Sequence, residues 1–338
     1  MAPKNQPKPK KSTKNPASSS QAKRKRINPI PPSDVNPFIS EEAKERFDTI
    51  KSYEVVGERK FDVTKLTKYP MFDTMIRQRG WEELNNMVHE LNNKYVIMEF
   101  FTNAPFSRVK YQAYVRGRTV DFSPAAINGL LGLTPSEECE VQRLRGEGGG
   151  MEDEQWDELI AKMCRPGATW KMAQMLTYAD FLPIPKAWAS FVIQTLESTS
   201  CNSEIPLKRV FTVAAILDEK PIDVGTLIPN NIHELVTEKR AVVGHGSIIN
   251  WLCEKKLVEE YDGDLYMSTV QPIIDTTMDG FVKKYEAFLK EREGGEQQLM
   301  HHDNSSRPKW SMEREASMVL ISLSTLCCWS ICLLQPIG

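Results

Sequence analysis

The sequence predicts a mainly α-helical protein, an α+β chain with one or two short β-hairpins and a multi-helical globular body. After residue 38, apolar residues recur at helical spacing in roughly ten segments, and only short stretches alternate as strands do. Gly, Pro and Ser separate these segments. The composition is 41% hydrophobic and 26% charged, which is typical of a globular protein with a sizeable core. The 338 residues are enough for one large domain or two modest ones.

The first 37 residues have a different composition. They are rich in Lys, Pro, Ser, Asn and Gln and hold almost nothing apolar before Ile27. Because such a segment cannot bury enough surface to offset its ordering entropy, residues 1–37 are predicted to form a disordered basic arm. Residues 1–36 hold nine Lys or Arg and one acid, a charge of +8, whereas the rest holds 34 basic and 44 acidic side chains, a charge of −10.

Two basic clusters lie within this arm, separated by eleven residues: Lys10 and Lys11, then Lys23, Arg24, Lys25 and Arg26. This spacing is typical of a bipartite nuclear import signal, in which an extended chain reaches two acidic grooves of one receptor. The clusters therefore predict a nuclear import receptor as partner and the nucleus as location. The alternative is a solubilising tail that binds nucleic acid without sequence preference, and the two roles are compatible.

The body is predicted to span residues 38–293, with two subdomains divided near 134–150. That acidic, Gly-rich segment has the composition of an exposed loop. Residues 294–315 follow as a polar linker, and residues 316–338 form a hydrophobic tail.

The amino-terminal half of the body begins with Ser40, a good N-cap for a helix with two acids in its first turn. A short strand or extended arm is predicted over 54–63. Gly80 is expected to end one helix before the next begins. The segments of this half with helical spacing are 40–50, 71–79, 84–91 and 94–102.

The stretch from Tyr111 to Leu133 combines a hairpin with a helix. Alternating residues flank the dipeptide Arg116-Gly117, which suits a tight turn. Ser123 is then a predicted N-cap with Pro124 at the first helical position, and Gly132 ends the helix. Each of these residue types has a structural role, so this stretch is interpreted as scaffold.

The carboxyl-terminal half continues with helical spacing. One of its helices is predicted to start at Pro185, and another is expected to stop before Pro221. A small turn or hairpin is predicted over 261–275. The helical segments of this half are 151–164, 185–198, 206–220, 225–236, 244–258 and 276–293.

No motif for catalysis, cofactor binding or metal binding is predicted. A Gly-x-Ser-x-Gly elbow is missing, and Gly148–Gly150 is not followed by the Lys-Ser/Thr of a phosphate loop. The run Gly244–Ser247 is better explained as a helix start, with Ser247 or its neighbour as N-cap. Asp262 and Asp264 are interpreted as residues of a glycine turn. No cysteine or histidine spacing matches a zinc site, and the odd number of seven cysteines favours reduced thiols.

One segment of the body is a candidate nucleic-acid surface, because basic residues and aromatic side chains that could stack on bases alternate in it. Its residues are Arg108, Lys110, Tyr111, Tyr114, Arg116 and Arg118. A solvated strand face is the competing interpretation, since the body as a whole is acidic and repels phosphate.

The tail contains nineteen consecutive residues without a charge, 316–334, which is close to the length that spans a bilayer. One interpretation is a tail anchor that holds the protein in a membrane. The other is a segment appended by read-through or mis-splicing, which is the interpretation favoured here because its composition changes abruptly after the polar linker.

Several phrases of the sequence together resemble a known family: RGWEELNNMV, VIMEFFTNA, VRGRTVDFSPAAINGLLGL, PIPKAWASFVIQTLESTSCNSEIPLKRV and GHGSIINWLC. They resemble the "putative plant transposon protein" domain, over roughly residues 40–292. The resemblance implies an open reading frame derived from a plant retroelement, of the kind described as gag-like or transposase-like. The family provides no catalytic residues that could be assigned to positions of this chain.

Taken with the residues, the resemblance favours a non-catalytic protein of a plant transposable element. We expect it to act in protein interaction, including self-association, or in nucleic-acid packaging, with the basic arm directing it to the nucleus and binding nucleic acid. Two alternatives stay open. A metal-dependent transposase or nuclease would require acidic side chains that converge in a cleft. A tail-anchored protein would be located at a membrane, and the cytoplasm is the other alternative to the nucleus.

Overall fold

The structure, a computed structural model, describes residues 36–136, 138–146, 153–171, 174–199, 203–237 and 241–302, except for the side chains of Asp153 and of residues 294–302. The chain divides into two units, of which the first ends at Phe281 and the second begins at Val282. The described residues are mainly helical, with short strands in small sheets, so the predicted fold class is confirmed. The import clusters within residues 1–35 and the tail 316–334 lie outside the described residues.

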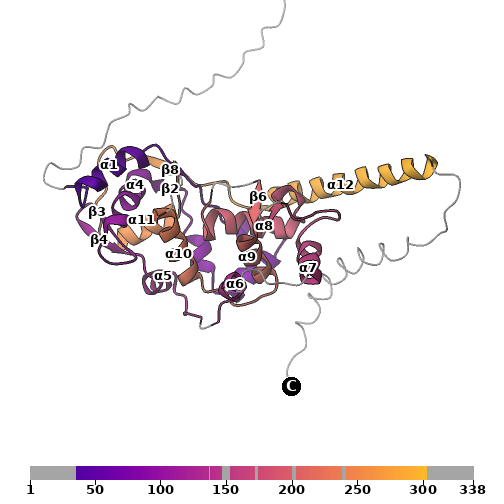
Figure 1. Ribbon diagram of the computed structural model, residues 1–338, viewed down its shortest axis with the longest axis horizontal. Helices are drawn as coiled ribbons and strands as arrows, with labels where there is room; N and C mark the ends of the chain where they lie inside the picture. The colour runs from indigo at the N-terminus through magenta and orange to yellow at the C-terminus, as the bar shows by residue number, and fades with distance from the viewer. Residues whose placement is uncertain are drawn as a thin grey trace, which may run out of the picture. The chain divides into compact units, whose positions relative to one another are not determined.

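Helices make up most of the first unit (Figure 1). In its amino-terminal half the helices are α1 (Glu41–Ile50), α2 (Met71–Gln78), α3 (Glu82–Asn86), α4 (Lys94–Asn103) and α5 (Pro124–Leu131), with the short 3-10 turns η1 (Val63–Lys65) and η2 (Ala104–Phe106). In its second half they are α6 (Glu140–Gly146), α7 (Asp153–Met163), α8 (Pro183–Phe191), α9 (Leu207–Leu217), α10 (Val224–Thr237) and α11 (Gly246–Lys255), with the 3-10 turn η3 (Tyr178–Asp180) and the π-helical turn η4 (Val192–Leu196).

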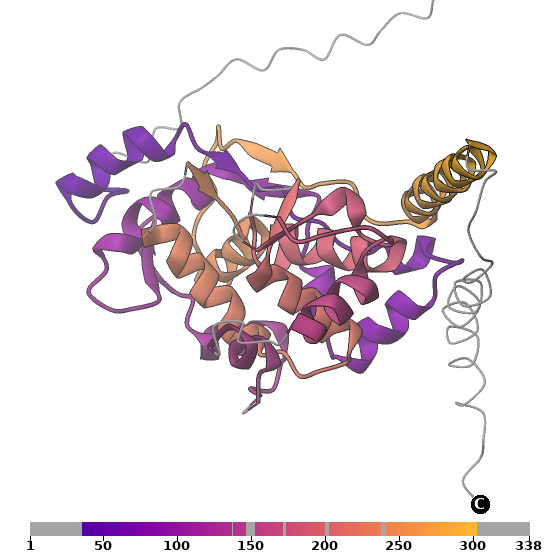
Figure 2. The same ribbon diagram turned by 45° about the vertical axis from the view of Figure 1, so that its right-hand side comes forward.

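The strands form four two-stranded sheets among the described residues. They are β1 (Glu54–Val55) parallel to β7 (Val242–Val243), β2 (Leu91–Asn93) antiparallel to β8 (Tyr266–Ser268), β3 (Gln112–Val115) antiparallel to β4 (Arg118–Asp121), and β5 (Met175–Thr177) antiparallel to β6 (Glu204–Pro206). Of these four described pairs, only β3 and β4 are joined by a tight turn, as predicted. Figure 2 shows β8 lying beside β2, although about 175 residues separate them in sequence.

Local capping explains where several helices begin and end. The hydroxyl of Ser40 accepts a hydrogen bond from the backbone N–H of Ala43 at 3.2 Å, and Ser123 caps α5 in the same way. Gly132 has φ of 65° and ψ of 25°, the left-handed conformation that ends a helix. Gly80, also at positive φ, follows α2. These predictions from local sequence are confirmed.

The hydrophobic core is one cluster that includes residues from both sides of segment 134–150. At one place in it, four aromatic rings meet: the ring centroid of Phe61 lies 4.8 Å from that of Phe72 and 4.8 Å from that of Trp188, and 5.4 Å from that of Phe191. All four rings are buried. Because helices from distant parts of the sequence share this core, α1, α4 and α11 are held together with the hairpin β3–β4 at one end of the unit (Figure 1). The predicted division into subdomains stays a prediction.

Two predicted elements are wrong in ways that tertiary contacts explain. The helix expected over 84–91 ends at Asn86, because residues 91–93 pair with β8, and Leu91 is 58% exposed rather than buried. The loop expected over 134–150 contains helix α6. Its Val141 is completely buried, and its Arg145 donates a hydrogen bond to Glu197 at 2.6 Å.

Other boundaries differ by smaller amounts. Helix α8 starts at Pro183 instead of Pro185, and the strand expected over 54–63 is only two residues long. The last helix, α12 (Asp275–His302), extends into the predicted linker. After two glycines at 294 and 295, this part of the linker continues with the helix-forming residues Glu, Gln, Leu and Met over 296–300. The part of α12 beyond Phe281 belongs to the second unit, where the rings of Tyr285 and Phe288 stack at 6.4 Å.

Candidate functional site

A cavity of about 360 Å³ opens beside helices α1 and α4 in the first unit. Its lining combines aromatic and charged side chains: Pro37, Phe38, Lys44, Phe47, Asp48, Tyr95, Glu99, Arg116 and Tyr261. Glu99 and Arg116 are buried, each with 7% of its surface exposed. A buried acid and a buried base beside an open cavity form the strongest candidate site of the described residues, because burying charge is costly unless a partner compensates it.

The hairpin turn places Arg116 in this site. Arg116 and Gly117 both have positive φ, 47° and 80°, and the strand register pairs Val115 with Arg118. This is the geometry of a two-residue turn whose twist matches that of its strands. The turn was predicted, but its arginine was expected to be solvated. Instead, its side chain points inward.

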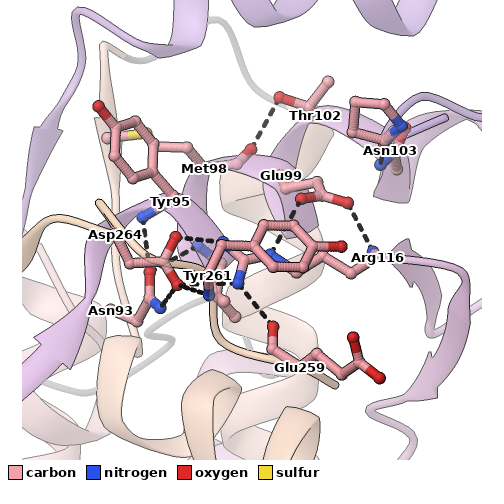
Figure 3. A network of polar contacts seen from close by, with 12 residues as sticks. Asn93, Tyr95, Met98, Glu99, Thr102, Asn103, Arg116, Glu259, Tyr261 and Asp264 are labelled. Atoms are coloured by element: carbon pink, nitrogen blue, oxygen red, sulfur yellow. Dashed lines mark hydrogen bonds and ion pairs between the residues drawn. The ribbon is translucent and has the colours of Figure 1, made fainter. Parts of the chain in front are cut away.

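Arg116 is held by two acids and a carbonyl (Figure 3). Its Nη2 donates to Oδ1 of Asp264 at 2.6 Å, and its Nη1 donates to Oδ2 of the same carboxylate at 2.8 Å. Nη1 also donates to the carbonyl of Glu259 at 2.6 Å. The Arg116 backbone N–H donates to Oε1 of Glu99 at 2.6 Å. The ring of Tyr261 covers the guanidinium at 4.1 Å, which adds a cation–π contact.

Asp264 joins this cluster to helix α4. Its Oδ2 accepts hydrogen bonds from Nδ2 of Asn93 at 2.6 Å and from the backbone N–H of Tyr261 at 2.9 Å. Asn93 in turn caps α4, because its Oδ1 accepts from the backbone N–H groups of Tyr95 and Val96. We call Arg116, Glu99, Asp264, Asn93 and Tyr261 the Arg116 cluster.

The two acids of the cluster have opposite pKa shifts. Burial raises the pKa of Glu99 from 4.5 to about 7, against the hydrogen bond and charge of Arg116. Burial also acts to raise the pKa of Asp264, but hydrogen bonds from Arg116, Tyr261 and Asn93 outweigh it, and the pKa is lowered. Burial acts to lower the pKa of Arg116, and Asp264 outweighs this so that the pKa is raised. Asp264 is therefore the charged partner of Arg116, and Glu99 is the acid that titrates near neutral pH.

The other members of the predicted nucleic-acid surface are not part of the Arg116 cluster. Arg108, Lys110 and Arg118 are exposed. Tyr111 is half-buried, with the Lys110 ammonium 4.4 Å from its ring centroid and its hydroxyl 2.7 Å from Oδ1 of Asn230. Tyr114 is also half-buried. The structure thus brings three cations to the surface of this segment and withdraws Arg116 from it.

A second buried polar cluster surrounds the start of α11, at the run Gly244–Ser247. The backbone N–H of Ser247 donates to Oε2 of Glu58 at 2.7 Å, and Nδ2 of Asn92 donates to the Ser247 hydroxyl at 3.1 Å. The predicted capping of α11 by Ser247 or its neighbour is therefore wrong. The N-cap position is His245, whose side chain does not cap, and the carboxylate of Glu58 reaches the helix start from another part of the chain. Glu58, Asn92, Ser247 and His245 are called the Glu58 cluster.

Burial controls the ionisation of this second cluster as well. It raises the pKa of Glu58 to about 7 and lowers the pKa of His245 to about 3. His245 is therefore neutral at physiological pH, and its Nε2 lies 2.8 Å from Oδ1 of Asn231. All four residues of the Glu58 cluster are buried, with at most 2% exposed. The cluster has the properties of a structural network rather than of a site open to a ligand.

Sequence reasoning missed Glu99 and Glu58, and it interpreted Asp264 as a turn residue only. The turn is present, since the Asp264 N–H donates to the Tyr261 carbonyl at 3.0 Å with Gly263 at φ of 101°. For Glu99 a signal existed, because it is the one acid in the apolar segment 95–101 of a buried helix. A charge there requires a partner.

Three further findings concern the described residues alone. No group of three His, Cys, Asp or Glu side chains among them is close enough to hold a metal ion. None of their helices combines the length and the apolar character that crossing a membrane requires. Cys139, Cys164 and Cys253 are free thiols.

Comparison with known proteins gives the family. Residues 77–259, a little more than half of the chain, match the model of the "Putative plant retrotransposon-related domain". No curated protein and no solved structure matches the chain. This family match supports a plant transposable-element protein.

The chain belongs to the plant retrotransposon-related domain family. The matched region contains Arg116 and Glu99, whereas Asp264 and Glu58 lie outside it. Each of the two clusters therefore includes a residue that lies outside the matched region.

Proposed function

We propose that this chain is a non-catalytic, gag-like component of a plant transposable element. In this proposal, the basic arm binds nucleic acid without sequence preference, and the helical body provides contacts between proteins, including copies of itself. The arm also carries the nuclear import signal. The observation that carries the proposal is the separation of charge, +8 on residues 1–36 and −10 on the remainder.

Charge separation supports this function for an electrostatic reason. Phosphate backbones bind clusters of Lys and Arg by releasing counterions, so affinity follows the number of unpaired cations that the protein offers. Several cations of the body are already neutralised by acids: Arg116 by Asp264, Lys44 by Glu41 and Lys68 by Asp279. The arm offers nine cations and a single acid.

The exposed cations Arg108, Lys110 and Arg118 support a secondary contact of the body with nucleic acid. Lys110 lies over the ring of Tyr111, so a base could stack there only by displacing it. We therefore assign this surface a smaller contribution than the arm.

The import role rests on the two clusters Lys10–Lys11 and Lys23–Arg26 and on the eleven residues between them. A fusion of the full chain to a fluorescent protein tests it. Replacement of all six residues by Gln is expected to remove nuclear accumulation, whereas replacement of Arg108, Lys110 and Arg118 is expected to leave it unchanged.

Binding of the full chain to a labelled single-stranded RNA at several salt concentrations tests the packaging role. The wild-type affinity is expected to fall steeply with salt, by about 0.7 in log K per log salt for each phosphate neutralised. Replacing the nine arm cations by Gln is expected to remove most of the slope. The matched control, with Arg108, Lys110 and Arg118 replaced, is expected to keep most of it.

Two results would overturn this assignment. The first is an unchanged slope after neutralisation of the arm. The second is cleavage of DNA by the full chain that requires added Mg²⁺ or Mn²⁺, which would instead support the transposase or nuclease alternative.

A further inference from the structure

We propose that the cavity beside the Arg116 cluster is a binding site for a lysine or arginine side chain, supplied by the segment Lys23–Arg26 of the same chain. This inference goes beyond the proposed function, because it gives the basic arm a partner within the protein and does not require nucleic acid.

The walls of the cavity suit a cation. Four of its nine lining residues are aromatic: Phe38, Phe47, Tyr95 and Tyr261. Phe38 and Phe47 lie 5.4 Å apart, and Tyr261 covers Arg116 with one face of its ring. Aromatic faces attract cations, and the methylene stem of Lys or Arg packs well against apolar walls. The volume of about 360 Å³ lies at the lower end of ligand pockets, which suits one side chain rather than a large molecule.

The carboxylate of Glu99 gives the cavity its acceptor. The Glu99 side chain is only 9% exposed, and its Oε1 accepts from the Arg116 backbone N–H. Its Oε2 lies 3.7 Å from Nε of Arg116, which is beyond hydrogen-bonding distance. Among the described residues, this long ion pair with Arg116 is the contact of Oε2. A buried carboxylate oxygen that lines a cavity and has only this long contact with a cation can also accept from the N–H groups of an ammonium or guanidinium group.

An anion is a poorer occupant, because the terminal nitrogens of the cations that line the cavity already have acceptors. Arg116 gives both terminal nitrogens to Asp264 and the Glu259 carbonyl, and Nζ of Lys44 lies 2.8 Å from Oε1 of Glu41. Asp48 adds a further acid to the lining. Nε of Arg116 has no hydrogen-bond partner among the described residues, but it is buried, so the groups left to meet a ligand are mainly aromatic faces and acceptor oxygens.

The sequence places a suitable cation close to the opening. Pro37 and Phe38 line the cavity, and Arg26 precedes Pro37 by eleven residues. A flexible chain of that length has a root-mean-square extension of roughly 20 Å, so the cluster Lys23–Arg26 can return to the cavity. Its effective concentration there is in the millimolar range, which favours occupancy by the same chain over a second copy.

The test uses full-length protein and a fluorescein-labelled peptide of residues 20–35. In wild-type protein the chain's own arm competes, so the peptide is expected to bind weakly. A full-length variant with Lys23, Arg24, Lys25 and Arg26 replaced by Gln is expected to bind it at least tenfold more tightly, measured by fluorescence anisotropy at physiological salt.

Variants of the cavity, made in that arm-neutral background, assign the site. Glu99→Gln keeps an oxygen for the Arg116 N–H but removes the charge, and we expect at least a fivefold loss of peptide affinity. Phe47→Ala is expected to weaken binding similarly. The matched control Glu254→Gln, at an exposed acid of α11 away from the cavity lining, is expected to change nothing. A circular dichroism spectrum verifies folding, and if Glu99→Gln does not fold, the rim variants Asp48→Asn and Phe38→Ser take its place.

Three results contradict the proposal. If the cavity variants and the Glu254→Gln control bind the peptide with equal affinity, the peptide is attracted only to the acidic surface of the protein and not to the cavity. If wild-type and arm-neutral proteins bind it equally, the chain's own arm does not occupy the cavity. If the wild type instead forms dimers that the arm replacements abolish, the occupant is a second copy. None of these results changes the salt slope for RNA, so the two proposals fail independently.

Discussion

The Arg116 cluster and the Glu58 cluster both bury ionisable side chains, but they compensate them differently. In the first, a guanidinium and a carboxylate form a two-bond ion pair, and a second acid lies beside an open cavity. In the second, no counter-ion among the described residues contacts the acid, and Glu58 relies on the N–H of Ser247 and the amide of Asn92. Burial alone therefore does not mark a functional site. Glu58 Oε1 also has no hydrogen-bond partner among the described residues, but only the first cluster combines a weakly paired acceptor oxygen with access from solvent.

The largest expected effect comes from removing the counter-ion of the first cluster. Asp264→Ala leaves Arg116 buried without its charged partner, so the free energy of unfolding is expected to fall by about 3–5 kcal/mol. Denaturation in urea measures it. The double variant Arg116→Met/Asp264→Leu is expected to recover most of the loss, since it leaves no unpaired charge. A single variant as stable as the wild type would show that the ion pair is not what holds the hairpin to α4.

The second cluster is expected to make stability depend on pH. Between pH 4.5 and about 7, folded protein keeps a proton on Glu58 that the unfolded chain has released, so the free energy of unfolding falls as the pH rises through this window. The shift corresponds to on the order of 3 kcal/mol. Glu58→Gln removes the part of this dependence that Glu58 contributes, whereas Glu99, whose pKa is also raised to about 7, keeps its own part. The variant is therefore expected to gain stability relative to wild type from pH 5 to pH 8. Parallel curves for the two proteins would contradict the assignment.

A smaller effect is expected from the tight backbone at the start of α11. A Cβ at Gly244 would lie 2.1 Å from Oγ of Ser198, which accepts a hydrogen bond from the His245 N–H. Gly244→Ala is therefore expected to destabilise the protein by about 1–3 kcal/mol, measured by thermal unfolding. An unchanged melting temperature would mean that Ser198 moves aside freely.

The smallest effect has the opposite sign. Gly129 lies on the exposed face of α5, and a Cβ there meets nothing within 4 Å. Gly129→Ala is expected to stabilise the protein by about 0.5–1 kcal/mol, because Ala costs less conformational entropy in a helix. The same thermal unfolding experiment measures it, and it is the matched control for Gly244→Ala. If both substitutions destabilise the protein, the space around the added Cβ, which is filled at Gly244 and empty at Gly129, does not decide the effect.

Local signals made much of the helical fold predictable. Ser40, Ser123 and Gly132 act on neighbours within a few residues, so their roles can be inferred from adjacent sequence. The strands β2 and β5 could not be inferred in that way, because their partners β8 and β6 lie far along the chain. Both polar clusters were missed for the same reason: 148 residues separate Asp264 from Arg116, and 189 separate Ser247 from Glu58.

The pairing of Arg116 with Asp264 has a consequence for synthesis of the chain. Translation proceeds from the amino terminus, so the hairpin with Arg116 leaves the ribosome well before Asp264 does. During that interval the arginine of the β3–β4 turn lacks its counter-ion, and we expect the amino-terminal half to complete its core only after release of nearly all of the first unit. A gene copy interrupted by a stop codon before position 264 therefore encodes a product that cannot finish folding, and we expect cells to degrade it.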